Sequence, residues 1–386
     1  MPRHPHASKT SDTLSDRVFS ALAAKAKALS RPIYPLHVGD TYLDPLPEAR
    51  AEAQRSAEHT RLHNYAPVQG EPALLEAIID KLRRHHGVEV AADELQVMSG
   101  ATAGLGTVVA ALLDPGDEVV LPAPFWPLIR GILASRGAIP IEVPLFTRLG
   151  EPGFDPAGAI EAVITPRTAA IYLNTPNNPT GAILDADTIA AIAELAEQHD
   201  LWVISDDVYA DLYFTPDRPQ LVSLYDKLRE RTLATFSLSK SHALAGARVG
   251  YTWGPLDAMK RVRSVQTYYT YCAPRPLQLG AAAALSKGDA WLAQARAAYA
   301  AAGRHSAQVL GVPAPAGGTF LFFEASAHLN AGETTLDFLE RCLQAGVLLT
   351  PGSVCGRAYQ DWIRISFTVL APDHHARALA ALKPLL

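Results

Sequence analysis

The spacing of apolar residues predicts several long helices. In residues 71–86, EPALLEAIIDKLRRHH, leucines and isoleucines recur every three or four positions, as expected of a helix with one apolar face. Basic residues occupy the last turn, and Gly87 follows as a stop. Similar patterns predict helices over residues 12–30, 277–310 and 334–345.

Between residues 95 and 255 the pattern changes to strands that alternate with helices. Short β-branched runs, DEVVLP, AIPIEVP, AAIYLN, LWVISD and LATFSLS, are separated by helical stretches such as DADTIAAIAELAEQHD, in which Asp185 is the expected N-cap. This alternation predicts an α/β fold with a mostly parallel sheet covered by helices on both faces. The later segments GGTFLFFEA, 334–345 and DWIRISF predict a smaller α+β unit.

Composition narrows the class of protein. With 386 residues, 48% apolar and 19% charged, the chain is globular rather than disordered or fibrous. The net charge of −5 offers no basic field for a phosphate backbone, so no nucleic-acid partner is expected. No apolar run is long enough to span a bilayer, no apolar segment follows the N-terminal residues, and three cysteines share no CxxC spacing. A cytoplasmic protein with no membrane partner is therefore predicted.

Polar residues gather where predicted strands end, which is where sites lie in such sheets. The segment VMSGATAGLG would expose the backbone N–H groups of Ala101 and Thr102 at a helix N-terminus, which suits a phosphate. Tight packing of a helix on a strand explains the same turn equally well. In YLNTPNNPTG, Asn178 belongs to a long polar run after a buried strand, which indicates either a turn or a site.

Two further strand ends carry charged residues. In VISDDVYADL, Asp206 ends an apolar strand, where an unpaired carboxylate is costly, so it requires a cationic or protonated partner unless it caps a helix. In TFSLSKSHALAGARVG, Lys240 lies at the mouth of the sheet, with Ser237 and Arg248 nearby. A lysine there can form a Schiff base once its pKa is lowered. Taken alone, it would read as an exposed loop lysine.

In this order, NNPTG, SDDVY and SxSKxxxxxxxR resemble the class I/II aminotransferases of pyridoxal phosphate fold type I. The resemblance runs from about Ile33 to the end of the chain. It implies a homodimer with a shared active site, and pyridoxal 5′-phosphate as cofactor. It also implies an N-terminal arm and part of a small domain in residues 1–44, a large cofactor-binding domain in 45–285, and a C-terminal small domain in 286–386.

The same resemblance assigns roles to individual residues. Lys240 would form the Schiff base, Asp206 would accept a hydrogen bond from the pyridinium nitrogen, and Tyr209 would bond the ring hydroxyl together with Asn178. Trp126, in PAPFWP, would stack on the ring. The phosphate would be held by Ala101, Thr102, Ser237, Arg248 and the neighbouring subunit's Tyr65. The substrate would be bound by Gly39, Asn178 and Arg364.

The implied reaction moves the amino group of an L-amino acid to a 2-oxo acid by a ping-pong mechanism. In TYYTYCAP, residues 267–274, Tyr268 stands about where dicarboxylate-specific relatives carry an arginine. The tyrosines favour an aromatic or neutral substrate, although Arg130 and Arg275 are candidates for binding a second carboxylate. Tyr42, in DTYLDPLP, departs from the family pattern and is a candidate to face the substrate.

Other functions stay open at this point. A β-lyase, a cyclase or an amino-acid oxidase on the same fold would keep the same cofactor residues. A non-catalytic regulator that binds the cofactor would normally add a basic DNA-binding domain. A metal site is not expected, because His59 and His63 in HTRLH lack the glutamate of HExxH.

Overall fold

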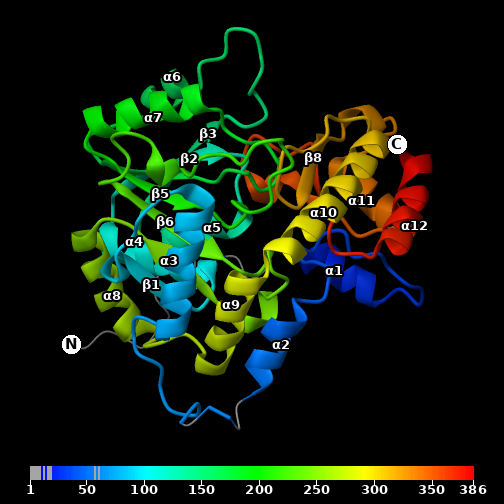
Figure 1. Ribbon diagram of the computed structural model, residues 1–386. Coiled ribbons are helices and arrows are strands. Elements are labelled where there is room, and N and C mark those ends of the chain that lie inside the picture. Colours follow the sequence, from blue (N-terminus) through cyan, green and yellow to red (C-terminus); the bar gives the residue numbers. More distant parts are fainter. Residues whose placement is uncertain (1–9, 12–13, 15–19, 56–57, 60) are drawn as a thin grey trace, which may run out of the picture.

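The computed structural model describes residues 10–11, 14, 20–55, 58–59 and 61–386 (Figure 1). Residues 12–13 and 15–19 of the helix predicted over 12–30 lie outside the described residues, as does almost all of the arm before it. The described part of that helix is α1, Ser20–Lys27.

Among the described residues, seven strands form one sheet in the order β1-β7-β6-β5-β4-β2-β3. They are β1 (Leu95–Met98), β2 (Glu118–Ala123), β3 (Ile139–Pro144), β4 (Thr168–Leu173), β5 (Trp202–Asp206), β6 (Thr232–Ser237) and β7 (Gly250–Trp253). The pairs from β3 to β6 are parallel, whereas β7 runs antiparallel to both β1 and β6. The prediction of a mostly parallel sheet is confirmed.

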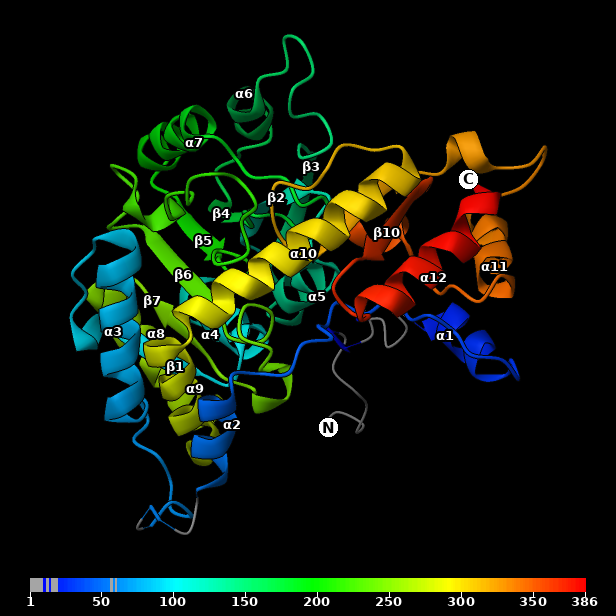
Figure 2. The same cartoon turned by 45° about the vertical axis from the view of Figure 1, so that its right-hand side comes forward.

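Helices cover both faces of this sheet, as predicted (Figure 2). Ala170 and Tyr172 of β4 share a core with residues of α4, α5 and α8, while Ile171 and Leu173 share a core with α7. Because successive side chains of a strand point to opposite faces, β4 is apolar along most of its length. Around β1, β6 and β7 the core is completed by α3 and α9.

The helices have these bounds: α2 (Pro47–Gln54), α3 (Pro72–His86), α4 (Ala101–Leu112), α5 (Pro127–Ser135), α6 (Pro156–Glu161), α7 (Ala186–Gln198), α8 (Leu256–Tyr269), α9 (Arg275–Lys287), α10 (Asp289–Leu310), α11 (Thr335–Gln344) and α12 (Pro372–Leu382). Short 3₁₀ turns are η2 (Ala92–Glu94), η3 (Val222–Leu224), η4 (Ala245–Ala247), η5 (Ser326–His328), η6 (Gly352–Cys355) and η7 (Lys383–Leu385). The Asp185 side chain caps α7 as expected, by accepting from the Thr188 N–H.

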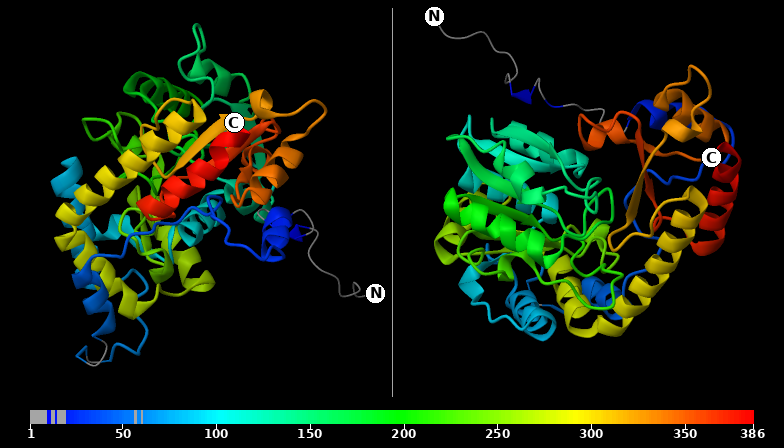
Figure 3. Two further views of the ribbon diagram at one scale, coloured as in Figure 1. Left: turned by 90° about the vertical axis from the view of Figure 1, so that its right-hand side faces the viewer. Right: turned by 90° about the horizontal axis from the view of Figure 1, so that it is seen from above.

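A second, smaller sheet has the order β8-β10-β9 and is antiparallel. Its strands are β8 (Phe320–Glu324), β9 (Thr350–Pro351) and β10 (Trp362–Ser366). The N-terminal segment joins it, because Tyr34 bridges to Val347 and the Leu36 carbonyl accepts from the Ser366 N–H at 2.7 Å. Helix α10 runs from the large sheet to this unit (Figure 3). The domain boundaries at residues 44 and 285 stay a prediction.

The single helix predicted over 277–310 is wrong. The chain forms α9 and α10, which meet at Gly288. A Cβ atom at Gly288 would lie 2.2 Å from the Ala284 carbonyl oxygen, so the turn between the two helices requires glycine. Lys287 and Gly288 form the same kind of stop as the basic residues and Gly87 at the end of residues 71–86, although the alanine-rich sequence continues on both sides of them.

Within the described part of the chain, no helix is long and apolar enough to cross a membrane, and no three His, Cys, Asp or Glu side chains are placed to hold a metal. His59 contacts a carboxylate instead, with its Nε2 atom 2.7 Å from Glu52 Oε1. The cytoplasmic location stays a prediction.

A buried ion pair fastens α3 to the loop that follows β5. Lys81 is 5% exposed and Asp211 is 7% exposed, and the Lys81 ammonium donates to the Asp211 carboxylate. Arg218 donates to the other carboxylate oxygen at 3.0 Å. Burial alone would raise the pKa of Asp211, but Lys81, His242 and Arg218 hold that pKa well below its usual range.

Replacing Lys81 with methionine should lower the free energy of unfolding at pH 7 by about 3 kcal/mol, because Asp211 then stays buried with Arg218 as its remaining ion-pair partner. The pKa of Asp211 is lower in the folded than in the unfolded chain, so this contribution is present above pH ~4 and is lost as the pH falls further. Urea unfolding at pH 7 and at acidic pH measures the difference. Lys260→Met on the surface is the control and should change little; an equal loss at both pH values would contradict the prediction.

Candidate active site

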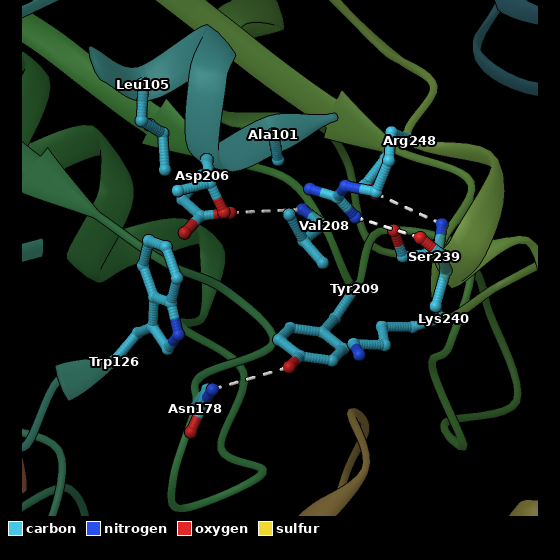
Figure 4. Close-up of a pocket in the computed structure, with 13 residues that line it drawn as sticks. Ala101, Leu105, Trp126, Asn178, Asp206, Val208, Tyr209, Ser239, Lys240 and Arg248 are labelled. Carbon is cyan, nitrogen blue, oxygen red and sulfur yellow. Dashed lines mark hydrogen bonds between the residues drawn. The ribbon is translucent and has the colours of Figure 1, made fainter. Parts of the chain in front are cut away.

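A cavity lies at the carboxyl edge of the large sheet, beyond β5 and β6 (Figure 4). The reversed strand β7 begins at this edge, since Gly250 pairs with Ser237, the last residue of β6. The segment before β7 therefore reaches the same cavity. The predicted site residues that line it are Ala101, Thr102, Trp126, Asn178, Asp206, Tyr209, Ser237, Lys240 and Arg248.

Asp206 is a buried acceptor at one end of the cavity. It is 3% exposed, and its carboxylate accepts from the Tyr172 hydroxyl at 2.6 Å and from the Val208 N–H at 3.3 Å. Burial raises the pKa of Asp206 to about 6, and these two hydrogen bonds oppose the rise. Residues 208–211 form a turn and no helix follows Asp206, so Asp206 is not a helix cap.

Lys240 lies in the turn after β6, and its ammonium donates to the Gly39 carbonyl. Burial lowers the pKa of Lys240, with Asp40 opposing this shift and Arg248 adding to it. A lowered pKa favours the neutral amine, which a nucleophile or base requires. A Cβ atom at Gly39 would lie 2.4 Å from the Phe320 ring, so glycine lets this loop segment pack against that ring.

The other end of the cavity suits an anion. Helix α4 begins there at Ala101, with its first N–H groups at the positive end of the helix dipole. Gly100, at φ +81°, precedes it, and a Cβ atom at this position would lie 2.6 Å from Arg248 Nη2. Glycine therefore makes room for the guanidinium beside the helix start, and the Ser237 hydroxyl borders the same space.

A second compartment continues from the first. Its lining residues are His37, Val38, Gly39, Trp126, Asn178, Tyr209, Lys240, Phe320 and Arg364. Arg364 is 3% exposed and donates to Asn178 Oδ1 at 3.2 Å, so it is not an outward-facing residue of β10. Its guanidinium lies 4.3 Å from the centre of the Phe320 ring, and Asn178 Nδ2 donates to the Tyr209 hydroxyl at 3.4 Å. Arg364 and Lys240 thus line one compartment.

Some candidates from the sequence lie outside the two compartments. Tyr65 is 79% exposed and packs edge-on against Tyr271, with ring centres 5.0 Å apart. Tyr42 packs against Tyr299 in the core of the smaller unit. Arg130 and Arg275 are ion-paired, with Glu142 and Glu71 respectively, and neither lines the cavity.

Two residues that hold Asp206 were missed from the sequence, as were His37, Val38 and Phe320 of the second compartment. Tyr172 bonds the Asp206 carboxylate, as described above, and Asn174 Nδ2 donates to the Asp206 carbonyl at 2.8 Å. Asn174 also accepts from the Asn178 N–H at 2.8 Å. Asn174 is the first polar residue after the apolar strand in YLNTPNNPTG, and Tyr172 lies two positions before it. Because side chains two positions apart in a strand lie on the same face, this spacing was the signal that could have predicted both residues.

These side chains fit pyridoxal 5′-phosphate. The cofactor carries a ring nitrogen, a ring hydroxyl, an aldehyde and a phosphate. The cavity offers a buried carboxylate, an amide and phenol pair, an amine, and an anion site formed by a helix start and Arg248, in a space bordered by the Trp126 ring. The donor set therefore matches each functional group of the cofactor.

Comparison with known proteins identifies the class. The family described as aminotransferase class I and II matches residues 31–382. The chain is 32% identical over 352 residues to an aspartate/prephenate aminotransferase of Thermus thermophilus, covering 86% of this chain and 87% of that protein. It is 35% identical over 275 residues to a probable N-succinyldiaminopimelate aminotransferase of Mycobacterium tuberculosis, covering 71% and 69%.

Solved structures of aminotransferases have the same fold as this chain. The structure of N-succinyldiaminopimelate aminotransferase from Mycobacterium tuberculosis superposes with a TM-score of 0.90 at 29% identity, over 99% of this chain and 100% of that one. Aspartate aminotransferase from Rhizobium meliloti gives 0.91 at 26% identity, over 99% of each chain. The chain belongs to the class I and II aminotransferase family, whose members use pyridoxal 5′-phosphate. It is a transaminase that depends on this cofactor.

Proposed function

We propose that the protein transfers the amino group of an aromatic or neutral L-amino acid to a 2-oxo acid by a ping-pong mechanism that uses Lys240. The observation that carries the proposal is the placement of the Lys240 amine and the Arg364 guanidinium in one compartment, beside the Trp126 and Phe320 rings. An amino acid with its carboxylate on Arg364 would present its α-carbon toward Lys240.

The cofactor, when bound, supplies an electron sink conjugated to the substrate's α-carbon. Asp206 would accept a hydrogen bond from the ring nitrogen and stabilise its positive charge, while Asn178 and Tyr209 would bond the ring hydroxyl. Ala101, Thr102, Ser237 and Arg248 would hold the phosphate. Lys240 would first bond the cofactor. Once displaced by the substrate, its amine would remove the proton from the substrate's α-carbon and donate it to carbon C4′ of the cofactor.

Substrate choice would depend on the wall of the compartment around Arg364. Trp126, Phe320 and Val38 give this wall an aromatic and apolar character, which suits an uncharged side chain. Arg130 and Arg275 are held by carboxylates outside the compartment. These features support an aromatic or neutral substrate over a dicarboxylate.

A homodimer with a shared active site is part of the proposal. Tyr65, Tyr268 and Tyr269 are 79%, 88% and 63% exposed, and aromatic side chains gathered on a surface mark contact sites. Light scattering should give the mass of two chains. Tyr65→Phe should keep the dimer but weaken cofactor binding about 10-fold, through loss of one hydrogen bond to the partner's phosphate. A fully active monomer would refute the shared site.

The absorbance of the purified protein with bound cofactor tests the function. Single amino acids from a panel should convert the cofactor to its amino form, and a 2-oxo acid should restore the original spectrum. Aromatic or neutral amino acids should react at the lowest concentrations. Release of ammonia, or of more than one equivalent of oxo acid per active site without an amino acceptor, would instead show a lyase or oxidase. No spectral change with any amino acid would refute transamination.

A further inference from the structure

The carboxylate of Asp206 is held from two sides by groups of this chain. The Tyr172 hydroxyl donates to Oδ2 at 2.6 Å, and the Val208 N–H donates to Oδ1 at 3.3 Å. Tyr172 lies on β4 and Asp206 ends the neighbouring β5, where Ile204 pairs with Tyr172. The parallel register therefore brings the phenol under the carboxylate, and each oxygen keeps lone-pair capacity for a ligand.

A hydroxyl at this position needs an explanation. Tyr172 is 1% exposed, and its ring packs in the apolar core between β4 and α4, where phenylalanine would pack as well. A buried hydroxyl is costly unless it is hydrogen-bonded. Burial raises the pKa of Tyr172 well above its usual value, so the phenol keeps its proton and can only donate to Asp206.

A donor at 2.6 Å acts on the protonation of Asp206. Burial favours the neutral carboxyl group, while the Tyr172 hydrogen bond favours the carboxylate. The other titratable groups that face this pair are Asp207 and Tyr209, from the turn after β5. Burial, with Asp206 adding to it, raises the pKa of Asp207 to about 7. The hydrogen bonds from the Tyr172 hydroxyl and the Val208 N–H are the contacts that favour the ionised form of Asp206.

We infer that Tyr172 is a positioning residue for transamination: its hydroxyl orients the Asp206 carboxylate and keeps it ionised toward the cofactor's ring nitrogen. The inference rests on the proposed role of Asp206. It predicts that the Tyr172 hydroxyl matters only when the ligand carries a ring nitrogen.

The test compares Tyr172→Phe with the wild type, using pyridoxal 5′-phosphate and an analogue in which a CH group replaces the ring nitrogen. In Tyr172→Phe, the equilibrium dissociation constant of the cofactor should rise about 10-fold or more relative to the wild type. The dissociation constant of the analogue should change less than about 2-fold. In the loaded enzyme, kcat should fall by a similar factor and KM should change little. Tyr359→Phe is the matched control. The Tyr359 hydroxyl lies 3.2 Å from the Thr147 hydroxyl, within hydrogen-bond distance, and Tyr359 does not line the cavity.

The outcomes separate the inference from the proposed function. Equal weakening of both ligands by Tyr172→Phe would mean a structural role, and no weakening of either would mean no role; both overturn the inference. Asp206→Asn tests the proposed function separately: if it leaves the preference for the ring nitrogen unchanged, the role of Asp206 is wrong. If it removes that preference while Tyr172→Phe does not, the inference about Tyr172 alone fails.

Discussion

Replacing Lys240 with alanine should lower kcat by about 10⁴-fold or more, because no other side chain in the compartment can take its two roles. The amine would both bond the cofactor and move the α-proton, and burial lowers its pKa toward the neutral form that these roles need. Steady-state rates with the best amino acid of the panel measure the loss. Single-turnover experiments, with the loaded enzyme in excess over the amino acid, show whether the proton-transfer step itself has slowed.

The loss must be separated from unfolding. Asp206, Arg248 and the start of α4 are untouched in this variant, so it should still bind the cofactor, and its melting temperature should stay close to that of the wild type. Lys260→Ala provides the control, since this lysine is exposed on α8 and pairs with Asp257. Normal turnover by Lys240→Ala would show that the proposed scheme is wrong.

Much of the fold could be predicted from the sequence, because the pattern of each strand is local. Runs such as LWVISD are apolar on both faces, as buried parallel strands must be, and they gave the strands β2 to β6. Strands β1 and β7 were harder, since their apolar residues merge into polar site segments. Gly288 shows a different limit. The contact that requires glycine there is with the Ala284 carbonyl oxygen, one turn earlier at the end of α9, and the alanine-rich sequence on both sides hides this local stop.

The candidate site also contains residues that the sequence pointed to and residues that it did not. Asp206 and Lys240 could be singled out as candidates because charged side chains stand out after apolar strands, and the resemblance to the family gave each its role. Tyr172 could not, because a tyrosine inside an apolar strand is typical of a core. Its importance depends on the register between β4 and β5, which places its hydroxyl at Asp206. The role of Tyr65 depends on a second subunit and stays a prediction.

Replacing Arg364 with lysine should lower kcat/KM for amino acids by about 10²-fold. Lysine keeps the charge but not the planar fork that binds a carboxylate with two hydrogen bonds, and one bond to a charged group contributes about 1.5–3 kcal/mol. The rest of the site should tolerate the change, although the bond from Arg364 to Asn178 Oδ1 would be weakened. Steady-state kinetics on the preferred amino acid measures the effect.

A substrate without a carboxylate distinguishes recognition from structure. For the amine that corresponds to the preferred amino acid, kcat/KM should be low in the wild type and nearly the same in Arg364→Lys, because there is no carboxylate to lose. The preference of the enzyme for the acid over the amine should therefore shrink by the same factor of about 10². If both substrates lose activity equally, Arg364 acts by holding Asn178 and the Tyr209 hydroxyl in place, and the substrate carboxylate must be bound elsewhere in the compartment.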